Sequence, residues 1–196
     1  MSTVLELYKT ERLAVNNSIM LDANEHYEQW VKVPDSILAD LNRYPDSSAL
    51  ALRQKLAGHY CGNNVQAENI LITSGSIEAI DLLVTAYNPS LLILNTPTYD
   101  VYKLRADAHG CECKLIPLDS SSQPQVDRII ENAKKGSMVV FISPNNPTGK
   151  LMDGNLVRRV IENSKGMVVI DEAYIEFAGL QNSLQFLAME YQNELY

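Results

Sequence analysis

Three polar side chains follow two short apolar runs in the second half of the chain. Asn146 comes shortly after the run 138–142, and Asp171 and Tyr174 come at the end of the run 167–170. A carboxylate that leaves a buried strand is costly unless it meets a cation or a hydrogen-bond donor. The phenol and the amide can both donate. Together the three groups would suit a heteroaromatic ring that carries a cationic nitrogen and an anionic oxygen.

Pyridoxal phosphate is a ring of that kind, and a carboxylate beside its nitrogen is a recurring device for making it an electron sink. Each residue also has an ordinary explanation when it is taken alone. Asn146 could cap a loop, Asp171 could end a strand and Tyr174 could pack in the core. Both explanations remain open at the level of single residues.

The elements that must position these residues form a strand–helix–strand unit. The two apolar runs predict buried strands, and the segment 143–149, with two prolines and a glycine, must end the first. Apolar residues at helical spacing predict a helix over 153–163. Such a unit closes right-handed and leaves its strands parallel. Asn146 and Asp171 are therefore expected beyond the carboxyl ends of neighbouring strands, where ligands bind in open α/β sheets.

The rest of the chain alternates apolar runs with helical patterns. Strands are expected at 69–72, 91–94 and 112–117. Helices are expected at 34–41, 49–60, 76–87, 125–135 and 183–191, with one more helix that ends near residue 108 and a possible short helix at 4–13. A glycine-containing turn, Thr73 to Ser76, feeds one of these helices. Free amide groups at a helix start suit a phosphate, although serine is also an ordinary N-cap residue.

Composition limits the classes of function. A chain of 196 residues with 46% hydrophobic and 20% charged residues suits one domain with a real core. A net charge of −8 argues against nucleic acid or an anionic membrane as a partner. No stretch approaches the roughly 18 apolar residues of a membrane span, and the start lacks a signal-peptide pattern. The three cysteines, Cys61, Cys111 and Cys113, are an odd number; Cys111 and Cys113 are too close together and too isolated for a metal site and are expected to be a free thiol pair in a reducing cytoplasm.

The motifs Asn145 to Gly149 and Asp171 to Tyr174 together resemble the fold-type I aminotransferases of classes I and II. The longer run Asp171 to Phe177 is similar to the histidinol-phosphate aminotransferase branch. The resemblance covers nearly all of this chain but only about the first half of such an enzyme. It implies an α/β fold that is part of the large domain: a mainly parallel sheet with helices on both faces, without the C-terminal strands and the small domain. Residues 1–45 would be an N-terminal arm and interface segment, and 46–196 the incomplete cofactor-binding domain.

The resemblance also implies roles for individual residues. Asp171 would stabilise the pyridinium, Asn146 and Tyr174 would donate to the ring oxygen, and Tyr99 would stack on the ring. The phosphate would be held by Gly75, Ser76, Ile77 and, across a dimer interface, Tyr44; the substrate would be contacted by Asn24 and Glu25. A turn tyrosine at 44 and a core tyrosine at 99 are the alternatives.

The family's Schiff-base lysine has no counterpart here, because no lysine follows a serine at a strand end downstream of Asp171. The chain alone is therefore expected to hold no catalytic residue and not to transaminate. With its missing part it would exchange an amino group between histidinol phosphate and 2-oxoglutarate in histidine biosynthesis, as a homodimer or paired with a complementary chain. The alternatives are a threonine-phosphate decarboxylase-like or other class I/II enzyme, and a non-catalytic dimerisation or interaction module.

A strand order is expected from the same resemblance. The strand 167–170 would lie between 138–142 and 91–94, and absent strands would lie between 69–72 and 138–142. The strand 138–142 would then have a bare apolar edge, which is a template for pairing with another chain.

Overall fold

The computed structural model describes residues 23–25, 28, 31–38, 41–60 and 65–191. The chain divides into two compact units, residues 1–51 and 52–196. In the first unit, the expected helix at 34–41 is the short α1 (Asp35–Leu38), and the possible helix at 4–13 lies outside the described residues. The second helix, α2 (Leu50–Tyr60), begins at the end of this unit. Among the described residues, no helix is long and apolar enough to cross a membrane.

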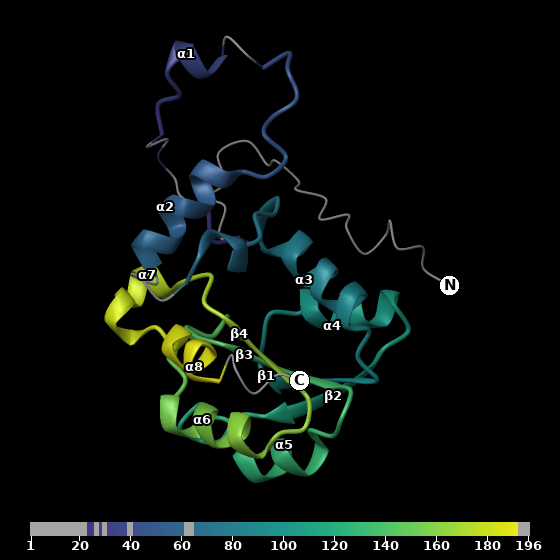
Figure 1. The fold of residues 1–196 in the computed structure, drawn as a ribbon. Coiled ribbons are helices and arrows are strands. Elements are labelled where there is room, and N and C mark those ends of the chain that lie inside the picture. Colours follow the sequence, from purple (N-terminus) through teal and green to yellow (C-terminus); the bar gives the residue numbers. More distant parts are fainter. Residues whose placement is uncertain (1–22, 26–27, 29–30, 39–40, 61–64, 192–196) are drawn as a thin grey trace, which may run out of the picture. The chain divides into compact units, whose positions relative to one another are not determined.

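The second unit is built on a parallel sheet of four strands (Figure 1). Their order across the sheet is β2-β1-β3-β4. Their bounds are Leu91–Thr96 for β1, Glu112–Pro117 for β2, Ser137–Ile142 for β3 and Met167–Asp171 for β4. These four strands were all expected from the apolar runs, and each lies within one or two residues of its expected bounds.

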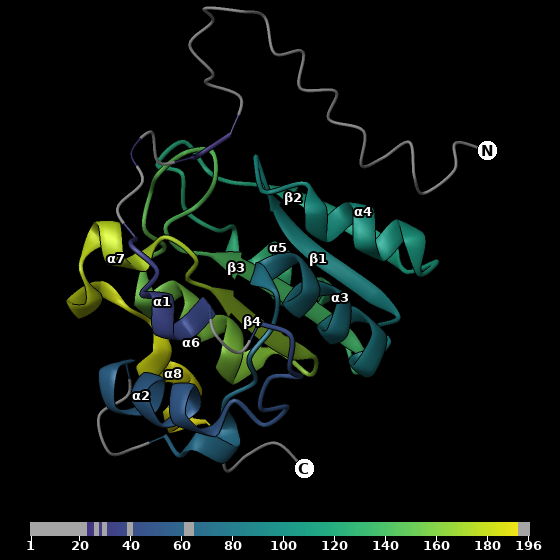
Figure 2. The same ribbon diagram turned by 90° about the horizontal axis from the view of Figure 1, so that it is seen from above.

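Helices cover both faces of the sheet (Figures 1 and 2). One face is covered by α3 (Gly75–Tyr87) and α4 (Val101–Ala108); the other is covered by α5 (Val126–Asn132), α6 (Gly154–Asn163) and α8 (Gln185–Glu190). The short α7 (Ile175–Ala178) follows β4. The α/β class, the parallel sheet and the helices on both faces are confirmed.

Strand β1 shows why its sequence is a continuous apolar run rather than an alternating one. Leu92 and Leu94 pack with α3 and α4, whereas Ile93 packs with α5 and α6. A strand that is covered on both faces needs an apolar residue at every position. Strand β3 follows the same rule, with all six of its residues buried. The sheet therefore has two cores, one on each face.

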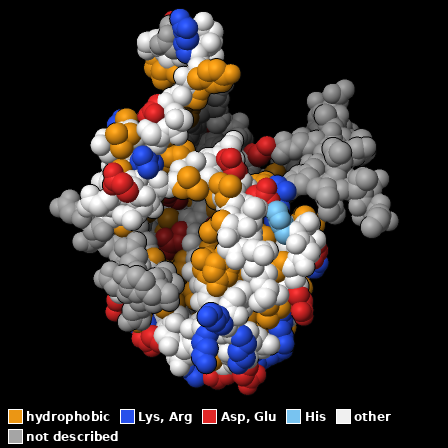
Figure 3. Space-filling model, turned by 45° about the vertical axis from the view of Figure 1, so that its right-hand side comes forward, with side chains coloured by type: hydrophobic (Ala, Val, Ile, Leu, Met, Phe, Trp, Pro, Cys, Tyr) orange, Lys and Arg blue, Asp and Glu red, His pale blue; other side chains and the backbone are white. Residues whose placement is uncertain are grey.

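The strand expected at 69–72 is absent. Residues Ala67–Asn69 form a short 3-10 helix, in which the Ile70 N–H donates to Ala67 O at 3.1 Å. The chain then continues to α3 without strand pairing, and Leu71 stays 71% exposed. A strand needs a paired neighbour to persist, and among the described residues no strand lies beside this segment. Other hydrophobic side chains also reach the surface, as Figure 3 shows.

The expected strand order is wrong. β1 pairs directly with β3, from Leu91↔Ser137 to Leu94↔Val140, and β4 lies outside β3. The short crossover through α6 places β4 beside β3. The bare edge expected on 138–142 therefore belongs to β4 instead: within the ranges that the structure describes, no strand pairs with the outer side of β4.

Candidate functional site

The order of the strands reverses between β1 and β3. From β1 the chain moves to β2 on one side, and it then returns to place β3 on the other side of β1. The loops that follow β1 and β3 diverge at such a point and leave a crevice at the carboxyl ends of the strands. A pocket of about 80 Å³ lies there, lined by Ser76, Tyr99, Ile142, Asn146, Asp171, Ala173 and Tyr174.

Most of the residues selected from the sequence for the cofactor meet at this pocket. The five that line it come from four separate parts of the chain: Ser76, Tyr99, Asn146, Asp171 and Tyr174. Gly75 and Ile77 flank Ser76 in the first turn of α3 but do not line the pocket. The structure therefore brings a hydroxyl, two phenols, an amide and a carboxylate to one small space.

Both oxygens of the Asp171 carboxylate accept hydrogen bonds. Oδ1 accepts from the Ala173 N–H at 3.0 Å, and Oδ2 accepts from the Tyr102 hydroxyl at 2.9 Å. The Asp171 backbone oxygen also accepts from the Ser143 N–H at 2.8 Å, which continues the β3–β4 ladder beyond β3. The strand pairing and the side-chain contacts together fix where this carboxylate lies.

Two adjacent asparagines in the loop after β3 differ in where their side chains lie. Asn145 is buried, and its Nδ2 donates to Pro97 O at 3.1 Å and to Thr148 Oγ1 at 3.0 Å. It thereby fastens the loop after β3 to the loop after β1. Asn146 lines the pocket. A buried asparagine that holds two loops together explains how Asn146 and Tyr99 come to border the same space.

The start of α3 supplies a different kind of group. Gly75 has a φ of +77°, and no atom lies within 4 Å of the place where a Cβ would be. The Ser74 N–H donates to the Glu78 carboxylate, and Thr73 Oγ1 donates to Gly75 O at 2.9 Å. The backbone at the helix start is thus held by local hydrogen bonds and faces open space. The Gly75 N–H itself donates to Thr73 O at 2.9 Å, so only the amides that follow it in the first turn could favour an anion there.

The remaining predicted residues belong to the other unit of the chain. Asn24, Glu25 and Tyr44 lie within 1–51 and are exposed, Tyr44 completely so. Their roles toward substrate and phosphate stay predictions.

Three residues of the site were missed from the sequence: Tyr102, Ile142 and Ala173. Ile142 and Ala173 line the pocket next to residues that were selected. Tyr102 lies behind Asp171, and burial raises its pKa far above that of an ordinary phenol, with the charge of Asp171 as the next cause. No local pattern pointed to it, because its partner Asp171 lies 69 positions away in the chain.

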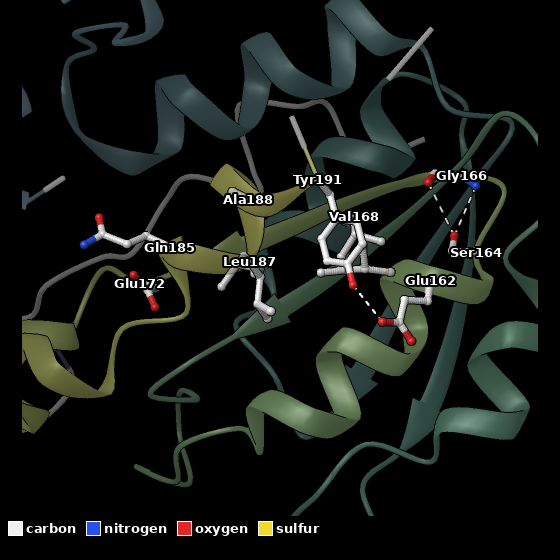
Figure 4. Close-up of a pocket in the computed structure, with 11 residues that line it drawn as sticks. Glu162, Ser164, Gly166, Val168, Glu172, Gln185, Leu187, Ala188 and Tyr191 are labelled. Carbon is white, nitrogen blue, oxygen red and sulfur yellow. Dashed lines mark hydrogen bonds between the residues drawn. The ribbon is translucent and has the colours of Figure 1, made fainter. Parts of the chain in front are cut away.

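A larger cavity of about 490 Å³ runs along the outer side of β4 (Figure 4). Apolar side chains of β4, α6 and α8 form much of its wall, among them Ile161, Val168, Ile170 and Leu187. Its polar groups are engaged with protein partners: the Tyr191 hydroxyl donates to Glu162 Oε1 at 2.7 Å, and Glu172 Oε2 accepts from Ser183 Oγ at 2.6 Å. None of the residues selected from the sequence lines this cavity.

The thiols and carboxylates offer no second centre within the described part of the chain. No group of three or more potential metal ligands occurs there. Cys111 and Cys113 are free thiols, and burial raises the pKa of Cys113 to about 11. A thiol with a raised pKa is a poor nucleophile at neutral pH.

The sequence of the chain matches a protein-family model and several curated proteins. The family model "Aminotransferase class I and II" matches residues 10–195. A histidinol-phosphate aminotransferase of Parabacteroides distasonis is 34% identical over 175 residues, which cover 87% of this chain and 47% of that protein. A histidinol-phosphate aminotransferase of Flavobacterium johnsoniae is 38% identical over 164 residues, covering 82% of this chain and 44% of that protein.

The chain is also similar to a solved structure of a histidinol-phosphate aminotransferase. The histidinol-phosphate aminotransferase of Clostridium acetobutylicum matches with a TM-score of 0.65 and 25% identity, over 81% of this chain and 46% of that one. The chain thus spans about half the length of the curated relatives that it matches.

Proposed function

Because the chain belongs to the class I and II aminotransferase family, we propose that it carries the cofactor-binding face of a pyridoxal phosphate-dependent aminotransferase. The amino group would come from histidinol phosphate, as the names of the curated relatives suggest, and 2-oxoglutarate is the acceptor that we propose. One observation supports this most strongly: Ser76, Tyr99, Asn146, Asp171 and Tyr174 line one pocket. The relatives are about twice as long, so activity, substrates and partners are all part of the proposal.

The groups at the pocket fit the proposed cofactor in kind. Asp171 is the charged side chain among the lining residues and is half-buried, and a cationic ring nitrogen would be a favourable partner for such a carboxylate. Asn146 and Tyr174 can donate to an anionic oxygen. The start of α3, with Gly75 facing open space, suits a phosphate. When bound, pyridoxal phosphate supplies an electron sink for the charge that develops on the substrate.

Each side chain then has one task. Asp171 keeps a proton on the ring nitrogen, while Asn146 and Tyr174 hold the ring oxygen. Tyr99 fixes the plane of the ring, since offset stacking contributes ~0.5–1.5 kcal/mol. Gly75, Ser76 and Ile77 would hold the phosphate, with Tyr44 of a second copy of the chain adding a donor; the Gly75 N–H, which donates to Thr73 O at 2.9 Å, would have to give up that bond to take part.

Residues 1–196 alone do not complete the exchange in this proposal. No lysine lines the pocket, and none follows Asp171 in the sequence. A covalent amine is needed to hold the cofactor and to move protons during the exchange. We therefore propose that the active form joins residues 1–196 to residues that supply that lysine, either in a longer polypeptide that forms a homodimer or in a complementary chain.

The test uses the complete gene product, incubated with pyridoxal phosphate, histidinol phosphate and 2-oxoglutarate. Glutamate should form, and the polypeptide of residues 1–196 should form none and should carry no borohydride-stable adduct on one specific lysine. Release of carbon dioxide from threonine phosphate would replace the proposal with the decarboxylase. Failure to bind pyridoxal phosphate at all would favour a non-catalytic interaction module.

A further inference from the structure

Tyr102 is a buried phenol that the proposed function does not yet use. It stands in the first turn of α4 and is only 3% exposed, within the core between α3, α4 and the sheet. It does not line the pocket. Its hydroxyl reaches across to the end of β4 and donates to Asp171 Oδ2 at 2.9 Å.

This hydrogen bond completes the fixation of the Asp171 carboxylate. The Ala173 N–H holds Oδ1 at 3.0 Å, so each oxygen has one protein donor from a different direction. A carboxylate held at both oxygens cannot rotate without breaking a bond. Each oxygen accepts two hydrogen bonds, so one position on each remains for a ligand in the pocket.

The donor role of Tyr102 does not depend on pH in the physiological range. Burial raises the pKa of its hydroxyl above that of an ordinary phenol, and the charge of Asp171 and the hydrogen bond to it act in the same direction. The hydroxyl therefore keeps its proton and cannot exchange roles with the carboxylate. Removing it would leave Oδ2 of the half-buried Asp171 without its protein donor.

We infer that Tyr102 is a positioning residue: it holds the Asp171 carboxylate in the orientation that meets the ring nitrogen of the cofactor. This inference rests on the proposed function. It assigns to one segment two separate tasks, because Tyr99, in the loop before α4, borders the pocket while Tyr102, three residues later, fixes Asp171 from behind. In the alternative explanation, the hydrogen bond to Asp171 only satisfies the buried Tyr102 hydroxyl and does not orient the carboxylate.

The experiment separates these explanations by measuring binding rather than turnover. The complete gene product is titrated with pyridoxal phosphate and with its 1-deaza analogue, in which a C–H group replaces the ring nitrogen. The quantity compared is the ratio of the two dissociation constants. Loss of packing weakens both ligands alike and cancels in this ratio, whereas a misplaced Asp171 affects only the ligand with the nitrogen.

Three variants are compared with the wild-type protein: Tyr102→Phe, Asp171→Asn and, as a matched control, Tyr87→Phe. Tyr87 packs against the same core, and its oxygen accepts from the Met167 N–H at 3.3 Å, at the other end of β4. The wild type should prefer pyridoxal phosphate on the order of tenfold, as expected for one charge-assisted hydrogen bond. Tyr102→Phe should lower this preference at least about threefold, and Tyr87→Phe should leave it unchanged.

The outcomes are distinct. A wild type without preference, or an Asp171→Asn variant that keeps it, would refute the ring-nitrogen role of Asp171 and with it the inference. If Asp171→Asn loses the preference while Tyr102→Phe keeps or increases it, the inference alone is overturned. Thermal unfolding checks that each variant folds. Should Tyr102→Phe fail to fold, Tyr102→Met, which also lacks the donor, takes its place with the same expected ratio.

Discussion

β2 and β4 are the two outer strands of one sheet, yet they are built differently. β2 contains Glu112 and Lys114, ends at Pro117, and exposes most of its residues at least in part. β4 reads Met-Val-Val-Ile before Asp171, and all five of its residues are half-buried. Charges and proline are the usual means of protecting a sheet edge, whereas a continuous apolar run is typical of a strand with neighbours on both sides.

The large cavity along β4 and the pocket at the carboxyl ends of the strands have different origins. The cavity of about 490 Å³ follows the outer side of β4, where an interior-type strand lacks a neighbour among the described residues. The pocket of about 80 Å³ lies at the end of the same strand and holds the polar groups. Size alone would select the cavity, whereas five of the residues selected from the sequence line the smaller pocket.

The largest difference in turnover between the two outer strands is expected when one carboxylate on each strand is neutralised. Asp171→Asn in the complete gene product should lower the turnover of histidinol phosphate roughly 10²- to 10³-fold, because an amide cannot keep the ring nitrogen protonated. Glu112→Gln, on exposed β2, is the matched control and should retain turnover within about twofold. Steady-state kinetics measure both, and similar turnover in the two variants would remove Asp171 from the site.

The next effect concerns how firmly the outer side of β4 is held. Leu187 on α8 is fully buried against this flank, whereas Leu115 on β2 is 43% exposed. Leu187→Ala should lower the free energy of unfolding by about 2–5 kcal/mol, and Leu115→Ala by no more than about 1 kcal/mol. Urea denaturation followed by circular dichroism measures both. Equal losses would show that the two edges are equally well packed.

Self-association offers a third way to sharpen the comparison. The polypeptide of residues 1–196, expressed alone, should associate through the apolar side of β4. Val168→Lys places a charge beside that edge and should weaken the association about tenfold. Leu115→Lys on β2 should not change it. Sedimentation velocity over a range of concentrations measures the constants, and a monomer at all concentrations would contradict the prediction.

The smallest effect is a pH dependence at β2. In the folded state the pKa of Cys113 is raised to about 11 from 9.0, chiefly by burial, so folding favours the neutral thiol. This contribution is fully present below pH 9 and is lost as the pH rises through 11, with a slope of at most about 1.4 kcal/mol per pH unit. Cys113→Ala should therefore lose less stability than the wild type between pH 9 and 11 in urea denaturation. Parallel losses would exclude Cys113 as the cause.

The sequence predicted what depends on local pattern. The unit β3–α6–β4, with Asn146 in the loop after β3 and Asp171 as the last residue of β4, follows from apolar runs, two prolines and a right-handed crossover. The order of strands did not follow, because it depends on which strand finds which neighbour. The segment 69–72 has the composition of a strand but no partner beside it among the described residues.

The missed part of the site has the same cause. Tyr102 gains its role from Asp171, a residue 69 positions away in the chain, and no local pattern links the two. Asn145 and Asn146 are identical in type and adjacent in sequence, yet only the fold decides which holds the loops and which faces the pocket. The resemblance and the positions at the strand ends therefore predicted the residues that line the pocket better than the residues that hold them in place.

The segment from Tyr99 to Tyr102 carries a consequence for how this protein can change length. Tyr99 borders the pocket and Tyr102 donates to Asp171 from the first turn of α4. Tyr99 lies in the loop before α4, so an insertion or deletion of one residue between the two tyrosines would shift the start of α4 relative to the pocket and displace the Tyr102 hydroxyl from Asp171. Natural variation in chain length should thus be absent between these two tyrosines.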